Sequence, residues 1–295
     1  MAEIVVVGSI NADLTVGVAR HPHPGETLLG TGGGISAGGK GANQAVAAAR
    51  LGSSVAMVGA VGDDTNAEDA TALLKEAGVD LSGVIIGTEV TGLAVITVAE
   101  DGENTIIVVP GANGEMGAGA VEKQKALIET AELVLLQGEI PADGFKRSVE
   151  LSRGRVVINL APVIDVDQDV LLRADPLVVN EHEAAGVLEM LGHASPDDPQ
   201  KQLDALMQAG FASVVITLGA DGALVAADGM SEKIDSPRVQ AVDTVGAGDA
   251  FTGALCHQLV HGADIVDAAR FAAKVGAFSV TRHGAQASYP LAGEL

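Results

Sequence analysis

Aromatic residues and cysteine are scarce in this chain of 295 residues. It has five Phe, one Tyr and no Trp, so aromatic residues make up 2% of the whole. Aliphatic side chains must therefore build the core, because hydrophobic residues still account for 47% of the chain. Cys256 is the single cysteine, which excludes a disulfide framework and a metal site of several thiolates. Its apolar neighbours favour a small buried side chain over a catalytic thiol.

Positive charge is scarce as well. Seventeen Lys and Arg stand against 39 Asp and Glu, which gives a formal net charge of −22. No basic cluster interrupts this acidity, so binding to the phosphate backbone of nucleic acid is disfavoured. The apolar stretch at the N-terminus ends at Gly8, which is too short for a signal peptide or a membrane span. We therefore expect a cytoplasmic protein with no nucleic-acid and no membrane partner.

The chain does contain short apolar runs that alternate with helical patterns. Runs of Val, Ile and Leu of this length are typical of strands buried on both faces of a parallel sheet. The expected strands are Ile4–Val7, Val55–Val58, Leu133–Leu136, Val156–Ile158, Leu177–Val179 and Val214–Thr217. The expected helices are Gly41–Leu51, the segment from Asp64 to Gly78, Ala247–His261 and Ile265–Thr281. This order predicts an α/β fold, a three-layer α/β/α core with a mainly parallel sheet.

Two stretches, Leu14–Leu29 and Gly92–Val109, alternate like strands and have no helix between the alternating segments. Asp101-Gly102 in the second stretch is a favourable hairpin turn. The stretches predict either a small separate β-sheet that acts as a lid or a plain extension of the main sheet's edge. The glycine run at 32–34 is interpreted as a hinge. With a lid, residues 1–12, 38–90 and 112–295 form the core, and residues 13–37 and 91–111 form the lid.

The glycine-rich segments, which contain many of the 38 glycines, do not fit two common nucleotide-binding motifs. A P-loop beginning at Gly34 fails because Gly41 stands where Ser or Thr would hold magnesium. A dinucleotide fingerprint beginning at Gly246 fails because Phe251 stands at its last glycine position. A P-loop NTPase and a Rossmann dehydrogenase are therefore disfavoured.

The segment from Asp243 to Phe251, with the sequence DTVGAGDAF, is the most informative. Glycine-rich backbone running into a helix leaves free N–H groups at Gly246, Ala247 and Gly248, a geometry suited to a phosphoryl group in transfer. Asp249 follows in the first helical turn. A substrate hydroxyl that gives its proton to this carboxylate could attack the phosphoryl group. The alternative is that Asp249 only caps the helix.

Seven segments in the right order make the chain resemble the PfkB-type carbohydrate kinases over nearly its whole length. The segments are GSINAD at 8–13, PGET at 24–27, GGKGANQ at 38–44, VPGAN at 109–113, NEHE at 180–183, TLGADG at 217–222 and DTVGAGDAF at 243–251. The resemblance implies ATP-dependent phosphorylation of D-ribose at its 5-hydroxyl and a homodimer formed through the lid. Another acceptor (deoxyribose, fructose or a nucleoside) and a non-catalytic sugar-binding regulator remain alternatives.

The resemblance also implies a role for each matching residue. Catalysis would use Asp249 as general base and the anion hole of Gly246, Ala247 and Gly248. The sugar would contact Asn11, Asp13, Gly39, Lys40, Asn43, Glu139 and Asp249. ATP and Mg²⁺ would contact Asn180, Glu183, Thr217, Leu218, Gly219, Ala220, Asp221, Gly222 and Gly248. A K⁺ ion would be held by the side chains of Asp243 and Ser288 and the backbone carbonyls of Val245, Ser279, Arg282 and Gly284.

Local chemistry offers alternatives to three of these roles. Asp13 could belong to an ordinary turn, Asn180 and Glu183 could be a helix-capping pair, and 217–222 could be a simple turn between strands. One departure from the family concerns the nucleotide. Ala273 stands where relatives often have His or Asn near the adenine, which leaves the preference for the phosphoryl donor open.

Overall fold

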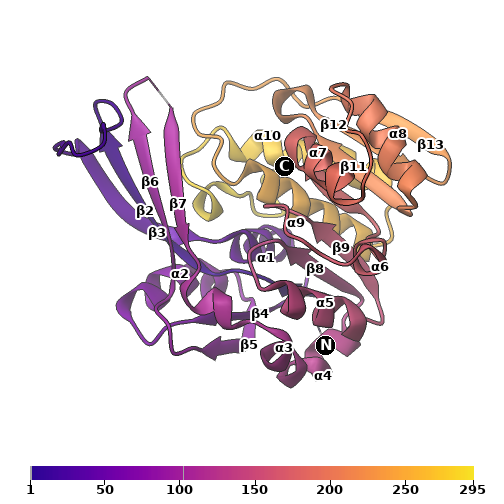
Figure 1. Cartoon of the computed structure of the whole chain (residues 1–295), viewed down its shortest axis with the longest axis horizontal. Coiled ribbons are helices and arrows are strands. Elements are labelled where there is room, and N and C mark those ends of the chain that lie inside the picture. The colour runs from indigo at the N-terminus through magenta and orange to yellow at the C-terminus, as the bar shows by residue number, and fades with distance from the viewer. Residues whose placement is uncertain (1, 102) are drawn as a thin grey trace.

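The computed structural model of the chain describes residues 2–101 and 103–295 and contains two sheets (Figure 1). In spatial order, the larger sheet consists of β13 (Met230–Ile234), β12 (Ala223–Ala227), β11 (Ser213–Thr217), β10 (Leu177–Asn180), β9 (Arg155–Asn159), β8 (Leu133–Gln137), β1 (Ile4–Val7), β4 (Val55–Val61) and β5 (Asp80–Ile86). Strands β11 to β5 pair in parallel, and β12 and β13 join antiparallel at one edge. The predicted mainly parallel sheet is confirmed.

Helices cover both faces of this sheet, which makes the predicted three layers. One face carries α1 (Lys40–Arg50), α2 (Thr65–Glu76), α9 (Ala247–Val260) and α10 (Ile265–Ser279). The other face carries α3 (Ala118–Lys123), α4 (Lys125–Thr130), α5 (Ala142–Leu151), α6 (Gln168–Leu171), α7 (Glu181–Met190) and α8 (Pro199–Ala209). Strand residues alternate between the two aliphatic clusters, so Ile4 and Val6 pack on one side and Val5 and Val7 on the other. Short 3₁₀ turns lie at Gly111–Glu115, Gly219–Asp221 and Gln286–Ser288.

The smaller sheet is separate from the larger one and projects from the core (Figure 1). Its strands, in spatial order, are β3 (Gly32–Gly38), β2 (Asn11–Val18), β6 (Gly92–Ala99) and β7 (Asn104–Val109). It is therefore a second sheet, and the edge-extension alternative is excluded. The proposed division of the chain into core and lid ranges stays a prediction.

The first lid stretch differs from its prediction. Strand β2 ends at Val18, and residues 19–31 of the described chain form no strand, although alternation was expected as far as Leu29. The hinge interpretation of residues 32–34 is wrong, because these glycines belong to β3 and pair with Thr15, Val16 and Gly17. A side chain at Gly33 would collide with the Thr15 carbonyl, so glycine is needed for this pairing. Gly102 of the predicted hairpin turn lies outside the described residues.

The helix ends agree with their local signals. The Asp64 side chain accepts a hydrogen bond from the Ala67 N–H and begins α2. Gly52 and Gly78 follow α1 and α2 with φ angles of 109° and 76°, the left-handed conformation that favours glycine. In the part of the chain that the structure describes, no helix has the length and apolarity needed to cross a membrane.

Candidate active site

The carboxylate of Asp249 lies in the first turn of α9 and is 7% exposed. Both of its oxygens accept hydrogen bonds from α1. The Asn43 side-chain amide donates to Oδ2 at 2.9 Å, and the Gln44 side-chain amide donates to Oδ1 at 2.8 Å. The structure therefore brings together the two glycine-rich segments singled out in the sequence, although more than 200 residues separate them.

The N-terminus of α9 has the geometry expected of an anion-binding site. Gly246 is the N-cap residue with φ 73°, and no side chain of the described residues caps the helix. A Cβ at Gly246 would lie 2.5 Å from the Tyr289 hydroxyl, so only glycine fits there. A Cβ at Gly248 would meet no described atom within 4 Å, so space lies open beside it. The prediction of three free N–H groups is wrong for Ala247, whose N–H donates to the Thr244 carbonyl at 3.3 Å. The N–H groups of Gly246 and Gly248 have no acceptor among the described residues and can bind an anion in that space.

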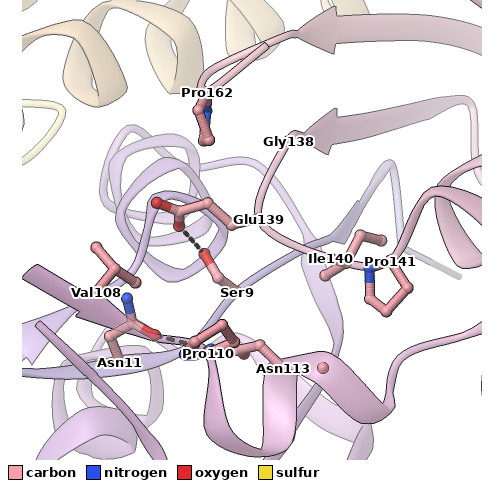
Figure 2. A pocket seen from close by; sticks show the side chains of 11 residues that line it. Ser9, Asn11, Val108, Pro110, Asn113, Gly138, Glu139, Ile140, Pro141 and Pro162 are labelled. Atoms are coloured by element: carbon pink, nitrogen blue, oxygen red, sulfur yellow. Dashed lines mark hydrogen bonds between the residues drawn. The ribbon is translucent and has the colours of Figure 1, made fainter. Parts of the chain in front are cut away.

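Polar side chains from the loops after β1 and β8, from the start of β2 and from the 3₁₀ turn at Gly111–Glu115 gather where the lid meets the core. A cavity of about 400 Å³ lies there. Ser9, Asn11, Asn113 and Glu139 help to line it (Figure 2). Glu139 accepts hydrogen bonds from the Ser9 hydroxyl and from the backbone N–H of Lys40. Asn113 donates to the Asn11 Oδ1 at 2.7 Å, which leaves the Asn11 amide nitrogen available to a ligand.

Asp13 has an unusual environment. Burial, followed by the nearby charges of Glu139 and Asp249, raises its pKa to about 6. Its Oδ1 is buried and has no hydrogen-bond partner among the described residues. A side chain at Gly38 would collide with the Asp13 carboxylate, so that glycine makes room for it. A buried acceptor without a donor fits the hydroxyl group of a ligand.

Lys40 supplies positive charge among these carboxylates. Asp249 contributes most to raising the pKa of Lys40, burial opposes the rise, and Glu139 and Glu183 add to it. The half-buried ammonium group therefore stays protonated at neutral pH. It offsets part of the negative charge that would otherwise repel a phosphate group.

A second cavity of about 770 Å³ lies between the β11–β12 turn and the start of α9. Seven of the residues assigned to the nucleotide line it, namely Asn180, Thr217, Gly219, Ala220, Asp221, Gly222 and Gly248. Leu218 and Glu183, also assigned to the nucleotide, are not among its lining residues. Ala273 does line it, together with the aliphatic side chains of Val239, Ala241 and Val280. The Leu218 N–H donates to the Gly222 carbonyl, so the segment is a turn between two antiparallel strands and a cavity wall at once.

Asn180 and Glu183 form a capping box at the start of α7. The Asn180 side chain accepts from the Glu183 N–H, and the Glu183 carboxylate accepts from the Asn180 N–H, both at 2.8 Å. Burial raises the pKa of Glu183, which outweighs the lowering effect of the Asn180 N–H and of Lys40. Asn180 and Glu183 are thus a helix-capping pair, as the alternative interpretation of these two residues predicted. Glu183 keeps one carboxylate oxygen outside the capping box.

The residues assigned to a K⁺ ion come from two segments that lie side by side. The Asp243 carboxylate accepts hydrogen bonds from the Val245 N–H at 3.0 Å and from the Gly284 N–H at 2.8 Å. Ser279 and Ser288 are buried. The Arg282 side chain lies over the Phe278 ring and pairs with Glu294, as expected if only its backbone carbonyl serves the site.

Several residues of the site were missed in the sequence. The register from Asp13 through Ala94 to Val108 places these three residues on one face of the lid, together with Ile96 and Ile106. Period-two alternation could have identified that face. The cavity wall at 236–241 has no regular structure and no motif, so no local signal identifies it. Gln137 and Asn159, which end β8 and β9, lie beside Gln44, and their positions at strand ends were the available signal.

Comparison with known proteins agrees with this geometry. The pfkB family carbohydrate kinase pattern matches residues 1–292. A ribokinase of Schizosaccharomyces pombe is 39% identical, and the match covers 98% of this chain and 95% of the relative.

Two solved structures are similar over nearly the whole fold. The crystal structure of a ribokinase from Thermotoga maritima has a TM-score of 0.91 at 31% identity, with 99% of this chain and 97% of that chain covered. The structure of an Arabidopsis thaliana ribokinase complexed with ribose and ATP has a TM-score of 0.89 at 32% identity, with 99% and 96% covered.

Proposed function

The chain belongs to the pfkB family of carbohydrate kinases, and we propose that it transfers the γ-phosphoryl group of ATP to the 5-hydroxyl of D-ribose, giving ribose 5-phosphate and ADP. The observation that carries this proposal is the position of Asp249. The buried carboxylate of Asp249 accepts a hydrogen bond from Asn43, one of the residues assigned to the sugar. In the chain, Asp249 directly follows Gly248, which lines the larger cavity. A ribokinase of similar fold that binds both ribose and ATP supports the choice of substrates.

The chemistry is an in-line displacement. The 5-hydroxyl oxygen forms a bond to the γ-phosphorus while the bond from that phosphorus to the β–γ bridging oxygen breaks, and ADP leaves. Asp249 accepts the hydroxyl proton as general base. The N–H groups of Gly246 and Gly248, together with the dipole of α9, stabilise the negative charge of the transferring group. The N–H of Ala247 joins them only after it leaves the Thr244 carbonyl. The donors at Gly246 and Gly248 are fixed before reaction, so they need little reorganisation.

The sugar is held by hydrogen bonds with its hydroxyl groups. Asn11, Asp13 and Glu139 come from the lid and the loop after β8, and Asn43 comes from α1. The backbone at Gly39 and the ammonium group of Lys40 complete the set. Paired amides and carboxylates discriminate between polyols better than apolar contacts do, because a missing hydroxyl leaves a buried polar group without its partner. The unpaired Oδ1 of Asp13 supports this assignment.

The chain's oxygen donors fit two cations. No cluster of three or more His, Cys, Asp or Glu suited to a metal occurs among the described residues, and Mg²⁺ commonly combines one or two carboxylates with waters and phosphates. Glu183, with its free carboxylate oxygen, and Asn180 would hold Mg²⁺ in that way, and bound Mg²⁺ would neutralise phosphate charge. The Asp243 carboxylate, the Ser288 hydroxyl and the four carbonyls suit K⁺, which would hold the 243–248 loop in shape.

We assign the smaller sheet the role of a lid that excludes water from the phosphoryl group. The same sheet is the proposed contact of a homodimer. Its strands expose apolar side chains, namely Ile35, Ile106, Ile107, Val108 and Val109, which are between 43% and 62% exposed. By the strand register, Ile35, Ile107 and Val109 lie on the face opposite Asp13, whereas Ile106 and Val108 lie on the same face as Asp13. The apolar patch on the face opposite Asp13 favours contact with a second copy of this otherwise acidic protein.

A coupled assay of ADP release across a panel of acceptors tests this function. We expect D-ribose to give the highest kcat/KM, above 2-deoxyribose, fructose and a nucleoside, and K⁺ to raise the rate. A clear preference for another acceptor would contradict the assignment to ribose. Absence of turnover with every acceptor, together with sugar binding in calorimetry, would instead identify a non-catalytic regulator.

The variant Asp249→Asn tests the mechanism. Loss of the general base lowers kcat by about 10²- to 10⁴-fold, while the affinity for ribose changes little because the amide keeps the size of the carboxyl group. The steady-state rate of product formation at saturating substrate gives kcat, and calorimetry gives the affinity for ribose. Asp264→Asn, a change of the same kind at the start of α10, serves as the control and should keep the wild-type kcat.

A further inference from the structure

Gln44 is completely buried beside the proposed general base, and every polar atom of its side chain has a partner. Its Nε2 donates to Asp249 Oδ1 and to Asn159 Oδ1, both at 2.8 Å. Its Oε1 accepts from Gln137 Nε2 at 2.6 Å. Neither Gln44 nor Gln137 has any exposed surface, and neither lines the cavities assigned to sugar and nucleotide. The role of Gln44 therefore lies in its contact with Asp249.

The orientation of this amide network is determined by its two ends. At one end the Val178 backbone carbonyl can only accept, so the Asn159 Nδ2 must face it, and does so at 2.9 Å. The Asn159 Oδ1 is thereby turned toward Gln44. At the other end the ionised carboxylate of Asp249 also can only accept. Gln44 must consequently direct its NH₂ group between the two acceptors, because its carbonyl oxygen would be repelled by both.

Close packing of α1 against α9 sets the distance that this contact requires. A Cβ at Gly253 would lie 2.6 Å from the backbone carbonyl oxygen of Gln44 and 2.6 Å from the Cβ of Ala47. Asp249 and Gly253 are four residues apart in α9, so they lie on one face of the helix. The missing side chain at Gly253 therefore allows α1 to approach the face from which Asp249 projects.

We propose that Gln44 is a positioning residue for Asp249, an inference that rests on the proposed function. With Asn43 on the other oxygen, Gln44 prevents the carboxylate from rotating. One donor on each oxygen leaves a second lone pair on each, and one of these faces the substrate hydroxyl. The bonds through Asn159 and Gln137 tie this orientation to the ends of β9 and β8, which are rigid parts of the core.

The variant Gln44→Met tests this role, because Met keeps the length of the side chain and removes both donors. We expect kcat for ribose to fall about 10- to 100-fold, as for a misplaced catalytic group, with the KM for ribose unchanged within about threefold. Gln202→Met is the matched control. Gln202 is also buried, and its amide donates to the Pro196 carbonyl in a region remote from α9.

A folded Gln44→Met protein with wild-type kcat would overturn the proposal. An equal loss of kcat in Gln202→Met would do the same, because the loss would then reflect general loosening of the core. If circular dichroism shows that Gln44→Met does not fold, Gln44→Glu replaces it. This variant keeps the shape but faces Asp249 with a second carboxyl group, so kcat must fall at neutral pH, and wild-type activity would refute the role. Failure of the proposed function itself is recognised separately, because wild-type protein would then not phosphorylate ribose.

Discussion

At the scale of single residues, Asp13 couples the site to the stability of the fold. Its pKa rises from 3.8 to about 6 because of burial and the charges of Glu139 and Asp249. Between these two pH values the folded protein keeps a proton that the unfolded chain has lost. The contribution of Asp13 to stability is therefore full below pH 4 and is lost as pH rises through 6. At neutral pH the ionised, buried carboxylate of Asp13 therefore lowers the free energy of unfolding of the wild-type protein. Its ionised form is the one that accepts hydrogen bonds from a sugar.

Asp13→Asn should consequently raise Tm at pH 7 to 8 by a few degrees, while it weakens ribose binding. The gain in Tm should shrink as pH falls below 6 and vanish near pH 4. Scanning calorimetry over this pH range measures the effect. Asp197→Asn, at an exposed carboxyl group, controls for the change of net charge. A Tm difference that does not depend on pH would contradict the assignment of the shift to Asp13.

At the scale of the helices and strands, the contact of α1 with α9 determines how the two glycine-rich segments meet. The helices carry Asn43 and Gln44 on one side and Asp249 on the other. At Gly253 the backbones of α1 and α9 lie closer together than a side chain at this position would permit. Gly253 is buried, so the helices cannot separate there without opening the core.

Gly253→Ala should therefore destabilise the protein by about 1 to 3 kcal/mol, the usual cost of overpacking, and lower kcat by displacing Asp249. Urea unfolding and steady-state kinetics measure the two effects. Gly119→Ala provides the control, since Gly119 lies in α3 and a Cβ there would meet no described atom within 4 Å. That control should be neutral or slightly stabilising, because Ala favours helix over Gly. Equal stability of the two variants would argue against the close contact.

At the scale of the whole molecule, the lid sheet leaves an apolar face uncovered. The edge strand β7 is exposed along its whole length, and Ile107 is 62% exposed. By the strand register, Ile107 and Val109 lie on the face opposite Asp13, so a partner can cover them without filling the sugar site. A second copy of the chain would also protect the free edge of the sheet from other pairing.

We expect the protein to be a dimer in sedimentation experiments and Ile107→Lys to shift it to monomer, because burying an unpaired ammonium group in the contact is costly. Ile86→Lys is the matched control. Ile86 is 72% exposed on β5, an edge strand of the main sheet that is not part of the lid, so its substitution should leave the dimer intact. A wild-type protein that sediments as a monomer would contradict the proposed contact.

The core and part of the site could be predicted from local sequence because their signals are local. Aliphatic runs identified six strands of the parallel sheet, since a strand buried on both faces needs apolar residues throughout. Asp64 and the glycines at 52 and 78 marked helix ends, since an N-cap acceptor and a left-handed residue act within one turn. The glycine-rich approach to Asp249 could be recognised in the same way.

Which segments pair with which, and which side chains meet, could be known only from the tertiary structure. Nothing local distinguishes a hinge at 32–34 from the strand that these residues form with β2, because pairing is decided by which backbone lies alongside. The contact of Gln44 with Asp249, the cavity wall at 236–241 and the cluster of charges that raises the pKa of Asp13 likewise join residues far apart in the chain. Sequence by itself determined six strands of the main sheet, the helices on one of its faces and most residue types of the site. Only the packing of α1, α9 and the lid decided how those residues meet, because burial and hydrogen bonding act through space.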